Sequence, residues 1–502
     1  MLGTIDDFFN ISRTDQAALF GNLAVWREPD MRNMAGKFPV IRLSWGNAEG
    51  TTYEAVRSLL VGEILRTYWN FDYLLKSDRL PASMTAVLAN FSLSATDAEI
   101  QTALLNLSMA LYRHHGVKPI ILLDEYDTPM QEAWLNGFWD SMASFVKVIL
   151  TSTFKNNPSL ERGLITGITR VGKESIFSDL NNPDVVTTTT EKYETAFGFT
   201  EAEVWQAMAV RGDTDCAGVK AWYDGFTFGR VRDIYNPWSV SCYLDKRKLA
   251  PYWANTSSNA LVSRLVRRGN RTLKESFEKL LAGGTVTTPV EEEIAFQDID
   301  SGEVSVLSLL LASGYLRVER ENSEEGTYDL ALTNREVRRT FEKLVKSWFE
   351  RDGDRAYPDF LEAFLALDAE AMTEALGRLV ASTVSFFDAA GAPEKFYHGF
   401  VLGLLVTFKG RFTLTSNRES GRGRYDVMLK PVDPGKDDAY ILEFKVAQGG
   451  ADKLTVAAEA ALTQIENRRY RAALEAEGFA GDRIHAVGLA FAGKDVLVQV
   501  KP

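Results

Sequence analysis

The sequence predicts an α/β protein built from several domains. At 502 residues the chain is too long for one hydrophobic core, so two to four domains are expected. Apolar strands alternate with amphipathic helices in the first third, which is the order of a parallel sheet with helical crossovers. Near the C-terminus strands outnumber helices. We expect an α/β domain over 1–214, a mainly helical middle region over 215–390 and a second α/β domain over 391–502.

The first third supplies the elements of the expected parallel sheet. Residues 118–124 (KPIILLD) form a near-continuous apolar run, which is typical of a strand buried on both faces. Residues 94–99 (SATDAE) offer N-cap side chains for a helix that runs to His115. The other elements expected here are a strand at 38–44, helices over 52–75 and 137–154, and a strand at 163–169.

The remaining elements follow from the same patterns. Thr200 and Glu203 form a capping box that opens a helix. Aromatic pairs at 222–223 and 252–253 suit either base stacking or core packing, and packing is the simpler interpretation. Further helices are expected over 305–314, 334–351, 359–387, 394–408 and 452–478, with strands at 315–318, 411–415, 424–429, 440–446, 485–491 and 496–500. Residues 431–435 (PVDPG) supply a hairpin turn.

Composition limits the classes of function. The net charge of −12 argues against a broad basic surface wrapped around nucleic acid, so any nucleic-acid site must be local. The two cysteines and four histidines form no metal-ligand pattern, and the cysteines suit free thiols in a reducing compartment. The start of the chain lacks the features of a signal peptide, and no apolar run reaches the length of a membrane span. We expect a cytoplasmic protein with no membrane partner.

Three residues near the C-terminus suggest phosphodiester hydrolysis. Asp426 and Glu443 lie on neighbouring strands of the expected hairpin, and alternation places Lys445 on the same face as Glu443. Two carboxylates suit Mg²⁺ or Mn²⁺, and the ammonium can orient water or stabilise developing charge. The alternative without a function is a solvated strand face with one salt bridge. Cations cluster nearby in the sequence, at Arg411, Arg418, Arg422, Arg424 and Lys430. Of these, Arg418, Arg422 and Arg424 are candidate nucleic-acid contacts. The alternative is that the charges form a solvated face, as charge runs usually do.

A second candidate site follows the apolar strand at 120–124. The run ends in Asp124 and Glu125, which resembles a Walker-B arrangement, in which Asp helps to hold Mg²⁺ and Glu polarises water. The alternative is a strand that ends in an acidic turn. Arg170 and Lys173, after the next strand, could sense a γ-phosphate or be surface charges.

The C-terminal motifs resemble the PD-(D/E)XK nuclease domain of a large family of bacterial AAA-ATPase-like proteins. The resemblance rests on residues 416–421 (SNRESG), 423–426 (GRYD), 441–445 (ILEFK), 394–399 (EKFYHG) and 461–465 (ALTQI). It implies a restriction-endonuclease-like α/β fold with Asp426, Glu443 and Lys445 in the catalytic places. Gln464 and Tyr470 match a Gln/Tyr motif of related nucleases, and Glu394 or Glu419 could be an additional carboxylate.

The ATPase-like part of the same family is matched by residues 124–129 (DEYDTP), 167–178 (GITRVGKESIFS), 222–225 (WYDG), 235–239 (YNPWS) and 255–259 (NTSSN). The resemblance implies a P-loop-type parallel-sheet domain. No G-x-x-x-x-G-K-[ST] motif occurs in the sequence. In the family that motif precedes a helix similar to residues 1–9, so we expect an N-terminally truncated domain that lacks the first strand. Without the phosphate cradle, we expect no appreciable ATP hydrolysis, and ATP binding only if the Walker A segment is supplied.

The leading hypothesis is a nuclease that requires Mg²⁺ or Mn²⁺ and carries an ATPase-like regulatory module. The alternative is a non-catalytic scaffold that binds nucleotide or a partner and has a degenerate nuclease fold. A third is a structural remnant without either activity. Nucleic acid is the expected partner, DNA in preference to RNA, and assembly of identical chains stays open.

Overall fold

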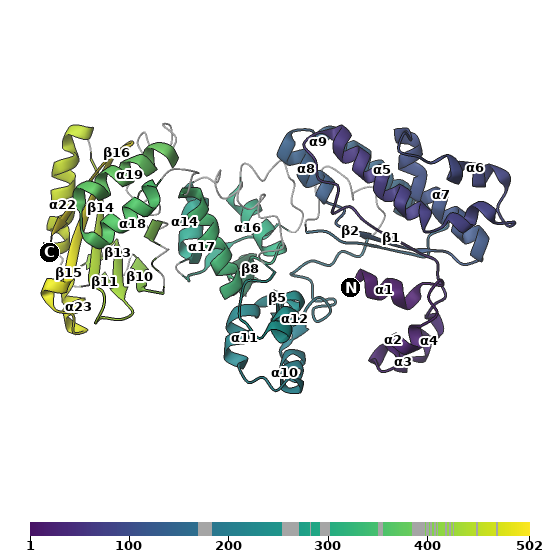
Figure 1. Cartoon of the computed structure of the whole chain (residues 1–502), viewed down its shortest axis with the longest axis horizontal. Helices are drawn as coiled ribbons and strands as arrows, with labels where there is room; N and C mark the ends of the chain where they lie inside the picture. Colours follow the sequence, from purple (N-terminus) through teal and green to yellow (C-terminus); the bar gives the residue numbers. More distant parts are fainter. Residues whose placement is uncertain are drawn as a thin grey trace. The chain divides into compact units, whose positions relative to one another are not determined.

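The computed structural model describes two compact units of the chain. Unit 1 comprises Met1–Thr187 and Val290–Ser313, and unit 2 comprises Thr188–Pro289 and Gly314–Pro502 (Figure 1). The residues described are 1–168, 183–253, 271–281, 283–291, 302–349, 355–383, 397, 401, 404–405, 408, 410–416, 419–420, 423–424, 426–447, 450–467 and 470–501. The three-region division expected from the sequence remains a prediction.

Unit 1 contains the expected parallel sheet. Its three strands are β1 (Val40–Ser44), β2 (Ile120–Asp124) and β3 (Arg162–Ile165), in that order across the sheet. All pairs are parallel, with Val40 in register with Ile120 and Ile120 with Arg162. The four apolar residues of β2 are buried, as expected for the central strand of a sheet with two covered faces.

Helices cover both faces of this sheet. Helix α1 (Leu2–Phe9) packs its Leu2 against Val40, Ile120 and Leu122 on one face. Helices α5 (Tyr53–Trp69), α7 (Asp97–His115) and α9 (Trp139–Leu150) lie along the other face (Figure 1). The remaining elements of unit 1 are α2 (Gln16–Phe20), α3 (Ala24–Arg27), α4 (Pro29–Met34), η1 (Asp72–Lys76), α6 (Ala82–Asn90), α8 (Thr128–Asn136), η2 (Thr151–Lys155) and α16 (Glu303–Ala312).

Local signals set the bounds of α7. Thr96 and Glu99 form a reciprocal capping box at its start, and Gly116 ends it in the left-handed conformation at φ 73°. Glycine adopts this conformation without the steric cost of a Cβ. The helix expected over 52–75 ends at Trp69, and a separate 3-10 turn, η1, follows it.

The first part of unit 2 combines helices with two small antiparallel sheets. Their strand orders are β4-β6-β5 and β7-β9-β8. The elements are β4 (Phe199–Thr200), α10 (Glu201–Val210), α11 (Cys216–Tyr223), β5 (Phe226–Phe228), β6 (Val231–Tyr235), α12 (Pro237–Lys246), α14 (Arg271–Leu281), β7 (Val286–Thr288), β8 (Leu316–Asn322), β9 (Thr327–Leu332), α17 (Arg335–Phe349), α18 (Ala356–Ala366) and α19 (Ala369–Thr383). The capping box of Thr200 and Glu203 is confirmed.

Two expectations for this part have clear outcomes. The single helix expected over 359–387 is wrong, because α18 ends at Ala366. The next residue, Leu367, is left-handed at φ 57°, and α19 begins afresh at Ala369. Trp222 and Tyr223 are buried in a cluster with Val204, Val219 and Tyr235, which favours packing over base stacking for this aromatic pair.

The C-terminal part of unit 2 is a mixed five-stranded sheet. Its strands lie in the order β10 (Phe412–Ser416), β13 (Val427–Pro431), β14 (Ala439–Val446), β15 (Ile484–Ala492) and β16 (Asp495–Lys501). Only the β14–β15 pair of this sheet is parallel. The expected hairpin between β13 and β14 is present.

The helices beside this sheet differ from the expected single helix over 452–478. Helix α22 (Leu454–Asn467) packs on the sheet, and α23 (Arg471–Ala476) is separate from it. A 3-10 turn, η4 (Ala451–Lys453), leads into α22, and another, η5 (Gly481–Arg483), leads into β15. Strands β11 (Glu419–Ser420) and β12 (Gly423–Arg424) form a small ribbon.

Candidate nuclease site and Walker-B-like site

The expected carboxylates meet where β13 and β14 pair. Val427 is in register with Leu442, so Asp426, one residue earlier, comes level with Glu443 on the neighbouring strand. Residues opposite each other in an antiparallel pair direct their side chains to the same face. The backbone N–H of Phe444 donates to Oδ2 of Asp426 over 2.9 Å, which holds that carboxylate against β14.

Glu443 is a buried charge with cationic and polar neighbours. Its side chain is 1% exposed, and the Nζ of Lys445 lies 3.7 Å from its Oε1. Lys445 is about one-quarter exposed. A buried carboxylate is stable only where nearby groups compensate for lost hydration. The alternation expected from the sequence therefore brings one acid and one amine together.

Gln464 reaches this pair from α22. Its Nε2 donates a hydrogen bond to Oε1 of Glu443. The close approach depends on Gly488, the register partner of Glu443 on β15. A Cβ on Gly488 would lie 2.7 Å from the carbonyl oxygen of Ala458 and 3.0 Å from Cγ of Leu462, both on α22. Gly488 was missed in the sequence because its role arises from a contact between distant segments.

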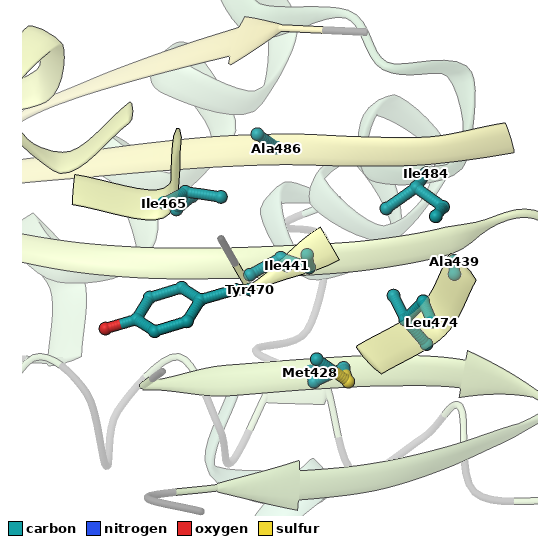
Figure 2. Packing of buried hydrophobic residues seen from close by; sticks show 8 residues of the cluster. All are labelled: Met428, Ala439, Ile441, Ile465, Tyr470, Leu474, Ile484 and Ala486. Atoms are coloured by element: carbon teal, nitrogen blue, oxygen red, sulfur yellow. The ribbon is translucent and has the colours of Figure 1, made fainter. Parts of the chain in front are cut away.

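Tyr470 lies between α22 and α23 in the chain and is buried. Its ring belongs to the hydrophobic cluster formed with Met428, Ile441, Ile465 and other buried residues. Figure 2 shows its hydroxyl on the side away from Ala439, the direction in which β14 continues toward Glu443. The ring is therefore part of the core, and any role in cleavage would depend on the hydroxyl.

The predicted arginine contacts lie largely outside the described residues. Arg418, Arg422 and Glu394 fall there, and only the backbones of Glu419 and Arg424, which are paired in the β11–β12 ribbon, are described. Two other cations of the expected cluster are engaged elsewhere. Arg411 donates to Asp437 through two nitrogens, and Lys430 lies 2.5 Å from Glu477. These two ion pairs weaken the case for a basic surface built from Arg411 and Lys430.

The donor set fits a hard divalent cation with two protein carboxylates. Among the described residues, no group of three or more His, Cys, Asp or Glu side chains could hold a metal ion. Mg²⁺ commonly takes one or two carboxylates and completes its shell with water and substrate phosphate. Asp426 and Glu443, with carboxylate oxygens brought to one level of the sheet, match that mode.

The second candidate site lies at the carboxyl end of the unit 1 sheet. The hydroxyl of Thr166, which follows β3, hydrogen-bonds to Oδ1 of Asp124. Glu125 has a left-handed backbone at φ 51°, and a Cβ on Gly46 would overlap its carboxylate. Burial, and then the negative charges of Asp124, Asp127 and Glu49, raise the pKa of Glu125 above its usual range. The acidic turn is thus a crowded cluster of carboxylates.

Asp127 is a further member that the sequence analysis did not single out. It is buried, and its Oδ2 accepts hydrogen bonds from the backbone N–H of Ile168 and the side-chain amide of Gln131. The signal was available as the third acid of residues 124–127 (DEYD). Asp127 fixes the turn after β2 to the segment after β3. Arg170 and Lys173 lie outside the described residues.

Within the described part of the chain, no helix is both long enough and apolar enough to cross a lipid bilayer. Cys216 and Cys242 are free thiols, as expected.

Comparisons with known proteins address both regions. Residues 1–177 match the family model described as "Predicted AAA-ATPase", and residues 392–501 match that of the PD-(D/E)XK nuclease superfamily. A protein of Azotobacter chroococcum mcd 1, described as "Uncharacterized protein in vnfD 5'region", is 24% identical over 391 residues, which cover 75% of this chain and 70% of that protein. No solved structure matches the chain. The chain therefore joins a region similar to the predicted AAA-ATPase family to a region similar to the PD-(D/E)XK nuclease superfamily.

Proposed function

We propose that the C-terminal domain is a metal-dependent nuclease that hydrolyses phosphodiester bonds. The observation that carries the proposal is the convergence of Asp426, Glu443 and Lys445 beside the first residue pair of β13 with β14. An exposed strand face with a chance salt bridge would not bury one of the acids at 1% exposure. Membership of the nuclease superfamily supports the same activity.

Asp426 and Glu443 are the proposed metal ligands. A bound Mg²⁺ or Mn²⁺ supplies Lewis acidity and lowers the pKa of a coordinated water. The hydrogen bond from Phe444 N–H fixes one oxygen of Asp426, so its carboxylate is oriented before a cation arrives. Preorganised ligands reduce the cost of binding a small cation that prefers regular geometry.

Lys445 and Gln464 have different proposed roles. The Lys445 ammonium lies beside Glu443 and is partly exposed, so it can contact a phosphate oxygen and stabilise the negative charge that grows there. Gln464 donates to Oε1 of Glu443 and is a positioning residue, because it acts through the carboxylate. Arg418, Arg422 and Arg424 remain candidates for backbone contacts with nucleic acid, and DNA is the substrate we favour.

We further propose that the N-terminal region regulates the nuclease and does not hydrolyse ATP in this chain. Its Asp124 and Glu125 stand at the carboxyl edge of the parallel sheet, where nucleotides bind in doubly wound folds. The sequence contains no Walker A motif to clamp the phosphates. Free cysteines support a reducing, cytoplasmic setting.

Cleavage assays with matched variants test the nuclease proposal. Labelled single-stranded DNA, duplex DNA and RNA are incubated with the full chain in Mg²⁺, Mn²⁺ or EDTA. Asp426→Asn and Lys445→Met should each lower the cleavage rate by about 100-fold or more, the scale of losing one transition-state contact. EDTA should abolish cleavage.

The controls are Asp433→Asn and Lys436→Met, which carry the same changes in the exposed hairpin turn. Both should retain the wild-type rate. Cleavage that survives Asp426→Asn would exclude this site. A folded chain without cleavage of any substrate in either metal would favour the alternative, a non-catalytic scaffold with a degenerate nuclease fold.

A further inference from the structure

Unit 1 carries a basic and aromatic surface where α7 ends. We call it the α7-end surface. It consists of Trp69, Tyr73, Lys76, Arg79, Tyr112, Arg113, His114, His115 and Lys118. These residues come from the end of α5, from η1 and the turn after it, and from the last turn of α7 and the link to β2. Turn η1 packs against α7, so segments distant in sequence form one surface.

Hydrogen bonds and a ring contact join five of these residues directly. The Tyr73 hydroxyl and Nε2 of His115 lie 2.8 Å apart. The Arg79 guanidinium donates to the carbonyl oxygen of His114 over 2.7 Å, and Nε of Arg113 donates to the carbonyl of Arg79 over 3.2 Å. The ring of Tyr73 also lies 5.3 Å from that of His114. These contacts hold Tyr73, Arg79, Arg113, His114 and His115 in one cluster. Trp69 and Lys76 belong to the adjoining end of α5 and to η1.

The local charge opposes the charge of the whole chain. No Asp or Glu occurs between Ile100 and Leu123, although the chain has a net charge of −12. The surface has four permanent cations, Lys76, Arg79, Arg113 and Lys118. Two acids neighbour it in sequence, Asp72 in η1 and Asp78 in the turn after it.

Exposed rings accompany the cations. Trp69 is 64% exposed, Tyr73 39% and Tyr112 40%. The Nζ of Lys118 lies 6.0 Å from the centre of the Tyr112 ring. A surface that binds single-stranded nucleic acid needs two components, cations and exposed aromatic rings. Phosphates contact the cations, and bases stack on the rings.

Helix capping explains only part of this cluster. Arg79 donates to a carbonyl in the last turn of α7, as basic side chains commonly do at helix C-termini. That role involves one of the five N–H groups of the guanidinium. It does not account for the exposure of Trp69, Tyr73 and Tyr112. Cations with exposed Trp and Tyr side chains also occur at membrane interfaces, and Leu75 and Met109 of the same elements are exposed, so anionic vesicles are the comparison in the test below.

The surface is distinct from the Walker-B-like site. Helix α7 leads into the amino end of β2 through Gly116–Pro119, whereas Asp124 and Glu125 follow the carboxyl end of the same strand. The two features therefore lie at opposite ends of β2.

We infer that the α7-end surface binds single-stranded nucleic acid, with phosphates on Lys76, Arg79, Arg113 and Lys118 and bases stacked on Trp69 and Tyr112. This binding is separate from cleavage and does not rest on the proposed nuclease site. Four neutralised phosphates predict a slope of about −3 for the logarithm of the association constant against the logarithm of salt concentration.

Fluorescence anisotropy of a labelled 20-residue oligo-dT, with the full chain in EDTA, tests the inference. The double variant Lys76→Glu with Lys118→Glu should weaken binding by at least about tenfold and reduce the slope to about −1.5. Trp69→Ala with Tyr112→Ala should weaken binding about tenfold with little change in slope. Circular dichroism establishes that each variant folds.

Lys192 and Tyr193 provide matched controls in unit 2. Lys192 lies over the exposed Tyr193 ring at 5.1 Å, which reproduces the Lys118–Tyr112 pair in another place. Lys192→Glu and Tyr193→Ala should each change the affinity less than twofold. Equal affinity of the wild type and both double variants would overturn the inference. So would loss of binding to a poly-glutamate peptide or to phosphatidylserine vesicles that equals the loss for oligo-dT. Because EDTA prevents metal-dependent cleavage, failure here leaves the nuclease proposal to its own assay.

Discussion

Glu443 on β14 and Gly488 on β15 are register partners in the parallel pair at the centre of the C-terminal sheet. The absence of a side chain on Gly488 allows α22 to approach β15, and α22 brings Gln464 to Glu443. A small residue on one strand thus sets the surroundings of an acid on the next.

Gly488→Ala should therefore disturb both packing and the site. Its Cβ would lie 2.7 Å from a backbone oxygen of α22, so the helix must shift, at a cost on the order of 1–3 kcal/mol. Hydrogen exchange of β15 amides measures the loss of stability. The control is Gly481→Ala, whose Cβ meets only the Glu475 carboxylate at 3.8 Å. Equal protection in the two variants would show that the close approach is unimportant.

Gln464→Leu should weaken metal binding at the proposed nuclease site. The change removes the N–H that donates to Oε1 of Glu443 and leaves a buried carboxylate with one fewer partner. Loss of such a supporting contact typically lowers metal affinity about 10- to 100-fold. Cleavage measured over a range of Mn²⁺ concentrations should show the half-saturating concentration shifted upward. Glu459→Gln, an exposed change on the same helix, serves as the control. An unchanged Mn²⁺ dependence would remove Gln464 from its proposed role.

The buried carboxyl of Asp224 should make part of unit 2 sensitive to pH. Burial, and secondarily the neighbouring carboxylate of Asp233, raise the pKa of Asp224 to about 7, although Lys220 partly offsets this. The folded state then holds a proton that the unfolded state has released, so stability falls as the pH rises from about 4 to about 7. Asp224→Asn should remove this slope and stabilise α11 and β6 at pH 8 by on the order of 2 kcal/mol. Hydrogen exchange of those amides at pH 5.5 and pH 8 provides the measurement. A pH dependence that persists in the variant would contradict the assignment.

Glu125 provides a test of the nucleotide site. The 502-residue chain should show no Mg²⁺-dependent ATP turnover above background, because it contains no Walker A motif to hold the phosphates. Glu125→Gln should therefore leave phosphate release unchanged. ATP hydrolysis that this substitution abolishes would show that Glu125 polarises an attacking water and that the phosphates are held by other means.

Local sequence signals predicted the strands and several helix ends well. The apolar run of β2, the capping box at Thr96 and Glu99, and the turn between β13 and β14 each act within a few residues. Strand alternation predicted that Glu443 and Lys445 share a face. The alignment of Asp426 with Glu443 depends on the β13–β14 register, which the sequence analysis left open.

Long-range contacts explain part of what was missed. The break between α18 and α19 had a local signal that was missed, because Asp368 accepts from the backbone N–H of Ala371 as an N-cap. Gly488 and Asp127 gain their roles from α22 and from the segment after β3, which lie far from them in sequence. Patterns among residues that are close in sequence do not show which distant segment of backbone will pack against a given residue.

The opposite charges at the two ends of β2 contribute a dipole component along that strand. Carboxylates gather after Asp124, and cations gather before Ile120. In the field of a polyanion such a body experiences a torque that turns its cationic end forward and its acidic end away. The carboxylate cluster would then face outward during an encounter, and the preferred approach would be set before any side chain makes contact.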